Sequence, residues 1–109
     1  VATGSEVHTA LAAADLLAAE GVSLRVVSMP CVDAFLEQGA AYRTEILGEG
    51  LPVASVEAGV TFGWSAITGA AGLNIGIDRF GASAPAGVLA EQYGLTPDAV
   101  AGRIRQWLA

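Results

Sequence analysis

The chain has 109 residues, of which 53% are hydrophobic and only 15% are charged. This length predicts a single domain spanning 1–109, and the apolar content excludes a disordered chain. The net charge is −6 and arginine supplies all five basic side chains, which excludes a nucleic-acid partner because such binding needs clustered positive charge.

The start of the chain and its single cysteine bear on the cellular setting. Residues 1–4 have the pattern of the end of a strand, and no basic segment followed by an apolar one precedes the first helix, so we predict no signal peptide. Cys31 has no second cysteine to pair with, which favours a reducing compartment. We therefore expect a cytoplasmic protein, of which this chain is one part.

The N-terminal part of the sequence predicts a strand, a helix and a second strand. Residues 1–3 form the first, short strand, and a helix follows over about 5–20. Thr3 and Glu6 have the spacing of a capping box, in which a hydroxyl and a carboxylate satisfy the first N–H groups of the helix. The run 24–29 is rich in β-branched residues and predicts a buried strand.

The middle of the chain predicts short helices and two further strands. Helical segments are expected over 33–36 and 40–47, and strands over 53–57 and 73–77. The twenty residues from 58 to 77 carry no charge, which is the length of a membrane span. Five glycines interrupt the run, so we predict a glycine-rich loop followed by a buried strand, and no membrane partner.

The C-terminal part predicts two helices. The first runs over 86–93. The second begins at Thr96, a good N-cap residue, with Pro97 in the first helical position. Leu95 and Val100 occupy the two positions of a hydrophobic staple.

Strands that alternate with helices indicate βαβ units. The strands are nearly continuous apolar runs, which is typical of parallel strands buried on both faces. We predict an α/β fold, a three-layer α/β/α sandwich with a mostly parallel, Rossmann-like sheet of four or five strands.

Thr3, Gly4 and Ser5 lie where the first strand passes into the first helix. In open α/β sheets such a turn offers free backbone N–H groups to an anion. A phosphate or carboxylate site is therefore one interpretation, and simple helix capping is the other. The capping interpretation is favoured, because neither GxGxxG nor a P-loop is present.

Glu57 follows a predicted strand at the carboxyl edge of the sheet, where α/β folds place their functional groups. It is either a general base or an anchor for the next loop, and the anchoring role is favoured. That loop carries Phe62 and Trp64, which are either core residues or anchors for a partner. We predict that Glu57, Phe62 and Trp64 face another domain or subunit. Asp78 and Arg79 are expected to form a local ion pair.

No set of residues predicts a catalytic, cofactor or metal site within the chain. His8 is the only histidine and is expected on an exposed helix face, so it has no partner for a triad or a metal cluster. Cys31 has neither a histidine nor a clear basic neighbour that would activate it as a nucleophile.

Several local strings, taken in this order and at these separations, resemble the C-terminal domain of transketolase. They cover nearly all of the chain: Ala2-Thr3-Gly4-Ser5-Glu6-Val7, Arg25-Val26-Val27-Ser28-Met29-Pro30, Phe35 with Gln38, Tyr42-Arg43, Val56-Glu57-Ala58-Gly59 with Trp64, Phe80-Gly81-Ala82-Ser83-Ala84-Pro85 and Gly94-Leu95-Thr96-Pro97. The resemblance is closer to transketolase than to deoxyxylulose-phosphate synthases or the β subunits of 2-oxo-acid dehydrogenases.

The resemblance implies a homodimeric, three-domain enzyme of the pentose phosphate pathway that moves a two-carbon ketol unit between sugar phosphates. It implies that thiamine diphosphate and a divalent metal, Mg or Ca, are held by the two preceding domains, and that this domain serves packing and dimer contacts. None of the family's cofactor motifs maps onto this chain. Two alternatives stay open, a regulatory anion- or nucleotide-binding module at the Thr3–Ser5 turn and an independent enzyme that uses Glu57 or Cys31.

Overall fold

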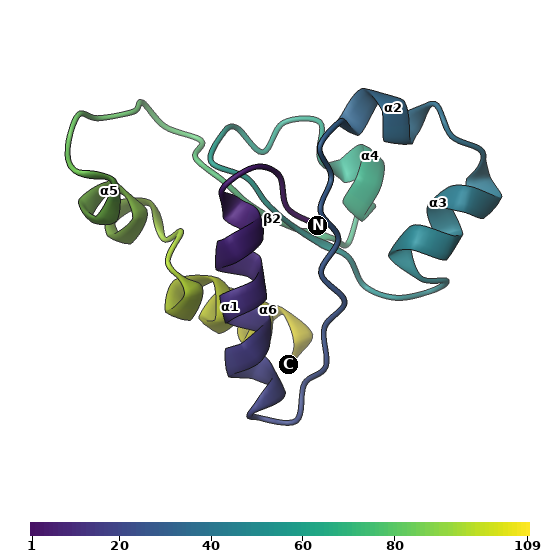
Figure 1. The fold of residues 1–109 in the computed structure, drawn as a ribbon, viewed down its shortest axis with the longest axis horizontal. Helices are drawn as coiled ribbons and strands as arrows, with labels where there is room; N and C mark the ends of the chain where they lie inside the picture. The colour runs from purple at the N-terminus through teal and green to yellow at the C-terminus, as the bar shows by residue number, and fades with distance from the viewer.

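A computed structural model describes residues 1–109 (Figure 1). Figure 1 shows α5 at one end of the molecule and α2 and α3 at the other, with α1 and β2 between them. The elements in chain order are α1 (Glu6–Ala18), α2 (Val32–Leu36), α3 (Ala40–Leu47), β1 (Ala54–Val56), α4 (Ser65–Thr68), β2 (Leu73–Ile75), α5 (Ala86–Tyr93) and α6 (Pro97–Leu108).

The sheet is parallel but smaller than predicted. Its two regular strands, β1 and β2, pair with Ala54 opposite Leu73 and Val56 opposite Ile75. On the other side of β1, Ala2 forms single parallel bridges to Val56 and to Ser28. The α/β class is confirmed, whereas the expected four or five strands are reduced to two regular ones.

The run 24–29 is extended, but it is not the regular strand that the sequence predicts. Its only bridge is at Ser28, because its neighbour in the sheet is the short Val1–Ala2 segment. A regular strand needs consecutive paired residues on both of the neighbouring segments. The two residues Val1 and Ala2 provide only one such pair with the run 24–29.

Helices cover both faces of the sheet, which confirms the three-layer arrangement. Alternate residues of a strand point to opposite faces. Val56 and Ile75 belong to the larger core cluster, together with residues of α1 and α6. Ser55, between Ala54 and Val56, is buried, and its Oγ donates a hydrogen bond to Asn74 Oδ1 at 2.8 Å. A second cluster, formed by Met29, Phe35, Trp64 and Ile67, includes residues of α2 and α4.

The predicted start of α6 is confirmed and that of α1 needs a correction. Thr96 caps α6, and its hydroxyl oxygen accepts a hydrogen bond from the Ala99 N–H at 3.3 Å. The capping box of Thr3 with Glu6 is absent, because Ser5 is the N-cap of α1 and Glu6 is its first residue. The box requires its carboxylate at the third helical position. Ser5 Oγ instead donates to Glu6 Oε1 at 2.9 Å.

The uncharged run from 58 to 77 forms a loop, the short helix α4 and β2. The sequence predicts the loop and the strand but not α4. None of the helices combines the length and the apolar character that crossing a bilayer requires.

Candidate functional site

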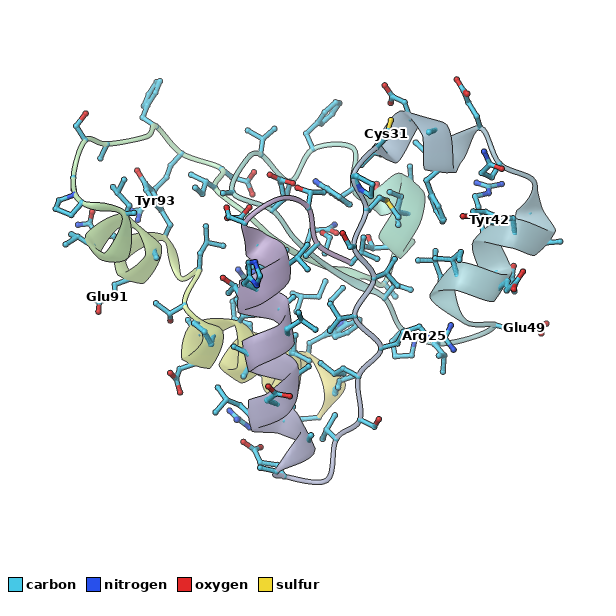
Figure 2. The ribbon with its side chains drawn as sticks, in the orientation of Figure 1. Arg25, Cys31, Tyr42, Glu49, Glu91 and Tyr93 are labelled. Carbon is cyan, nitrogen blue, oxygen red and sulfur yellow. The ribbon has the colours of Figure 1, made fainter.

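The carboxyl edge of the sheet gathers most of the residues that the sequence singles out. Here the Thr3–Ser5 turn enters α1, Glu57 follows β1, and Gly76 follows β2. Cys31 lies just beyond the Ser28 bridge, at the start of α2 (Figure 2). We call the residues 3–6, 57–62 and 76–80 the carboxyl edge.

Two loops of the carboxyl edge are joined by Asp78. Its Oδ1 accepts a hydrogen bond from the Thr61 N–H and its Oδ2 accepts one from Thr61 Oγ1, both at 2.8 Å. The Ile77 N–H also donates to the Gly59 carbonyl at 2.7 Å. The bonds from the Thr61 N–H and then from its hydroxyl hold the pKa of Asp78 below its ordinary value. The loops after β1 and β2 therefore form one connected unit.

The predicted ion pair between Asp78 and Arg79 is wrong, because each side chain has other partners. Arg79 Nη2 donates to the Gln92 carbonyl at 2.9 Å, and its guanidinium carbon lies 4.7 Å from the centre of the Tyr93 ring. The Tyr93 hydroxyl donates to the Phe80 carbonyl at 3.0 Å. These contacts attach the segment that follows β2 to the end of α5.

Glu57 is half-buried, and its surroundings shift the pKa of its carboxyl. Partial burial and, next, the negative charge of Glu6 raise its pKa above the ordinary value. The Thr3–Ser5 turn lies at the N-terminus of α1 beside these two carboxylates. The favoured capping interpretation is wrong for the side chains, because Ser5 makes no side-chain hydrogen bond to the start of α1. Anion binding at this turn stays an open alternative, and an anion there would meet the repulsion of Glu57 and Glu6.

We expect Glu57→Gln to stabilise the chain at pH 7 by a few degrees in Tm. A raised carboxyl pKa means that the folded state binds more protons than the unfolded one, so stability falls as pH rises above the ordinary Glu pKa of about 4.3. The amide has no charge to bury and no repulsion from Glu6. Thermal melts of both proteins at pH 7 and at about pH 3, below the ordinary Glu pKa, should show the gain only at pH 7. A gain of equal size at both pH values would contradict the electrostatic account.

The candidate reactive groups do not come together. His8 is exposed on α1, as predicted, and Cys31 is an exposed free thiol. No group of three or more His, Cys, Asp or Glu residues could hold a metal ion. Arg25 and Arg79 donate to backbone carbonyls, Arg25 to those of Glu45 and Ile46. The arrangement gives no nucleophile with its own base and no cationic cradle for a phosphate.

The two aromatic residues predicted at an interface have different surroundings. Trp64 is only 8% exposed and packs with Met29, Phe35 and Ile67, so it belongs to the second core cluster. Phe62 is 94% exposed. It follows Thr61, and thus projects from the unit that Asp78 holds together.

Sequence reasoning missed the exposure of Phe80. Its side chain is 99% exposed, and it lies two residues after Asp78. One sequence feature does indicate this exposure: Phe80 lies outside any periodic apolar segment and directly before Gly81. Phe62 and Phe80 thus extend into solvent from two loops that Asp78 and Thr61 connect. We call these two side chains the phenylalanine pair.

A family model for the transketolase-like C-terminal domain matches residues 1–96. The chain belongs to the transketolase family. The plasmid-encoded transketolase of Cupriavidus necator is 54% identical over 105 residues, which cover 96% of this chain and 16% of that protein. Transketolase 1 of Escherichia coli is 46% identical over 109 residues, covering 99% of this chain and 16% of that enzyme.

Solved transketolase structures have the same fold as this transketolase domain. A variant of the Pichia stipitis enzyme in complex with fructose 6-phosphate superimposes with a TM-score of 0.89 at 38% identity, over 96% of this chain and 15% of that one. The Leishmania mexicana transketolase gives a TM-score of 0.87 at 45% identity, over 97% and 15% of the two chains. The domain therefore spans about a sixth of the transketolases it matches.

Proposed function

We propose that this domain is the assembly module of a full-length, homodimeric transketolase. The whole enzyme would transfer a two-carbon ketol unit between sugar phosphates in the cytoplasmic pentose phosphate pathway. The relatives that match this chain support the activity, and the exposed Cys31 thiol fits a reducing compartment. One observation carries the assembly role, namely that Phe62 and Phe80 are almost fully exposed on connected loops.

The phenylalanine pair is suited to docking because its loops are already ordered. A phenylalanine side chain has few rotatable bonds and loses little conformational freedom on binding, and large aromatic side chains are typical anchors of protein interfaces. Asp78, Arg79 and Tyr93 hold the loops through hydrogen bonds and a cation–π contact. We propose that the pair packs against the second subunit, with Glu57 at the rim. Trp64 would support this surface from within the core.

The residues of this chain do not fit thiamine diphosphate or its metal. A diphosphate needs cationic groups or free helix N-termini, and a divalent metal needs several oxygen ligands together. Here the net charge is −6, the carboxyl edge carries Glu6 and Glu57, and no metal-ligand cluster exists. We propose that the cofactor and a Mg or Ca ion bind elsewhere in the full-length enzyme.

Activity assays on two proteins test this assignment. We expect the full-length enzyme, supplied with thiamine diphosphate and Mg²⁺, to transfer ketol units from a ketose phosphate to an aldose phosphate. The 109-residue chain, assayed under identical conditions, should give no turnover, because it holds no group that could carry the reaction. Turnover by the 109-residue chain would refute the assembly role, and an inactive full-length enzyme would refute the assigned activity.

A further inference from the structure

A cavity of about 360 Å³ is lined by residues of α2, α3, α4 and the loop that joins α3 to β1. One face of α3 forms part of its wall, because residues three, four and seven positions apart on a helix share a face. The residues of α3 in this wall are Ala40, Arg43, Thr44 and Leu47. Half of the 14 lining residues are hydrophobic, among them Phe35 of α2 and Ile67 of α4. Arg43 is the only cationic side chain in the wall, and we call this space the Arg43 cavity.

The Arg43 guanidinium has no partner within the chain. Its Nε is the only fully buried side-chain nitrogen or oxygen that lacks a hydrogen-bond partner. Its two Nη nitrogens also have no partner, and they are accessible to solvent. No carboxylate pairs with it, since the one salt bridge in the chain joins Arg105 to Glu20. A partly buried charge without a counter-charge is costly, so a bound anion would stabilise this group.

The other four arginines show that this state is unusual for the chain. Arg25 and Arg79 donate hydrogen bonds to backbone carbonyls, and Arg105 pairs with a carboxylate. Arg103 makes no hydrogen bond or salt bridge, but it is exposed on α6, where water solvates its charge. Arg43 is therefore the one arginine that is both half-buried and unpaired.

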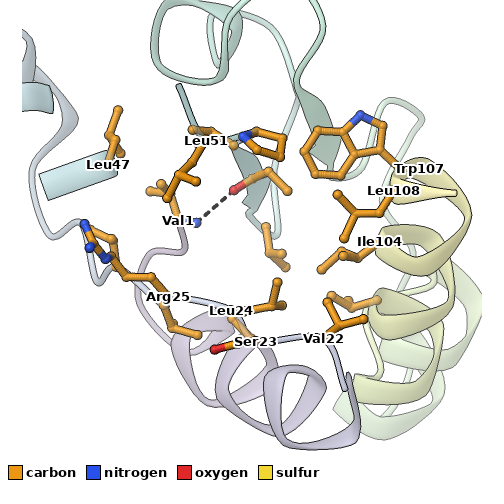
Figure 3. Close-up of a pocket in the computed structure, with 18 residues that line it drawn as sticks. Val1, Val22, Ser23, Leu24, Arg25, Leu47, Leu51, Ile104, Trp107 and Leu108 are labelled. Atoms are coloured by element: carbon orange, nitrogen blue, oxygen red, sulfur yellow. Dashed lines mark hydrogen bonds between the residues drawn. The ribbon is translucent and has the colours of Figure 1, made fainter. Parts of the chain in front are cut away.

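A neighbouring cavity shares Leu47 and Leu51 with the Arg43 cavity but offers no unpaired side-chain charge (Figure 3). It has a volume of about 220 Å³, and 15 of its 18 lining residues are hydrophobic. Its one arginine, Arg25, donates from Nη1 to the Ile46 carbonyl at 3.0 Å and to the Glu45 carbonyl at 3.1 Å. Of these two cavities, only the Arg43 cavity can recognise a ligand by its negative charge.

We propose that the Arg43 cavity binds a free organic monocarboxylate with a compact apolar body. The two Nη nitrogens would hold the carboxylate oxygens through a pair of parallel hydrogen bonds, the geometry in which a guanidinium recognises a carboxylate. Phe35, Leu47 and Ile67 would contact the apolar part. A phosphate ester or a dicarboxylate fits less well, because Arg43 is a single cation and Glu49 in the same wall repels a second negative charge.

The size of the cavity favours a small molecule over an acidic side chain from a protein surface. Ligand cavities typically have volumes of about 300–1,000 Å³, and the Arg43 cavity falls within that range. A single Asp or Glu side chain would pair with Arg43 but would leave most of the apolar wall uncovered. The cavity shares no residue with the phenylalanine pair or the carboxyl edge, so this inference goes beyond the proposed assembly role.

A ligand-observed NMR titration of the full-length enzyme with 4-methylpentanoate tests this proposal. We expect a Kd of about 1 mM or lower, which is reasonable for a ligand with so few atoms. The neutral amide, 4-methylpentanamide, should bind at least about tenfold more weakly, because hydrogen bonds to a charged group are lost.

Two matched variants connect this binding to Arg43. Arg43→Gln should weaken binding of 4-methylpentanoate by at least about tenfold, for the same reason. It should keep or raise the wild-type Tm, since it removes an unpaired charge, and this separates lost binding from lost folding. Arg103→Gln makes the same substitution at the exposed, unpaired arginine and should leave the Kd unchanged.

Three results would overturn the proposal. Absence of binding to the wild-type enzyme at about 10 mM 4-methylpentanoate would show that the cavity takes no free carboxylate. Equal Kd values for the wild type and Arg43→Gln, or for the acid and its amide, would show that the guanidinium does not hold the ligand. Tighter binding of the dicarboxylate glutarate would contradict the preference for a single negative charge. None of these readouts depends on catalysis.

Discussion

Gly76→Ala should destabilise the domain by about 3 kcal/mol, the upper part of the range for overpacking a tight site. A Cβ at position 76 would lie 2.5 Å from the Gly59 carbonyl oxygen and 2.9 Å from Thr61 Cγ2. The first of these atoms belongs to the backbone, so no side-chain rotation relieves the contact. The loop would have to move away from β2, which would break the bond between the Ile77 N–H and the Gly59 carbonyl.

Urea unfolding of Gly76→Ala and Gly81→Ala measures this effect with a matched control. Gly81 lies in the following loop, and a Cβ there meets no atom within 4 Å. Gly81→Ala should therefore change the free energy of unfolding by no more than about 0.5 kcal/mol, as surface substitutions usually do. Equal effects of the two variants would show that close packing of the two loops is not what requires glycine at position 76.

Leu17→Ala should cost about 3 kcal/mol of stability, within the range measured when large core side chains are truncated. Leu17 of α1 is fully buried in the larger core cluster, with residues of α6 and the sheet. Truncating its side chain leaves a cavity that the closely packed helices fill poorly. For a domain of this size we expect Tm to fall by roughly 15 °C.

Leu16→Ala is the control for Leu17→Ala, since the two residues are adjacent on α1 and the substitution is identical. Leu16 is 38% exposed and lies outside both core clusters. Thermal melts should show a loss of less than about 1 kcal/mol for it, since surface substitutions have small effects. A loss at Leu16 as large as that at Leu17 would place the core on a different face of α1.

The elements of this fold follow from local patterns, and most of them can be predicted. The start of α6, for example, is set by two adjacent residues, the N-cap Thr96 and Pro97 in the first helical position. The parallel class follows from the order of strands and helices. The regular length of each strand depends instead on what lies beside it. The run 24–29 has the composition of a strand but finds only the Val1–Ala2 segment to pair with.

The candidate site was harder to predict because residue type does not determine burial in a loop. Phe62 and Trp64 are two residues apart in one glycine-rich loop, yet the first is exposed and the second is in the core. The difference arises because Trp64 is the N-cap residue of α4, and it packs with Ile67 of that helix against Met29 and Phe35. The sequence predicts that Asp78 pairs with its neighbour Arg79, whereas its partner in the structure, Thr61, lies 17 residues away. Contacts of this kind require the three-dimensional arrangement.

Dimer dissociation of the full-length enzyme tests the assembly role most directly. Burial of a large apolar side chain contributes about 1.5–3 kcal/mol, so losing two should weaken the dimer by about 100-fold or more. Sedimentation velocity should show this for the double variant Phe62→Ser with Phe80→Ser. Val88→Ser, on the half-exposed surface of α5, should leave the dimer unchanged. If the double variant keeps the wild-type dissociation constant, the phenylalanine pair does not hold the enzyme together.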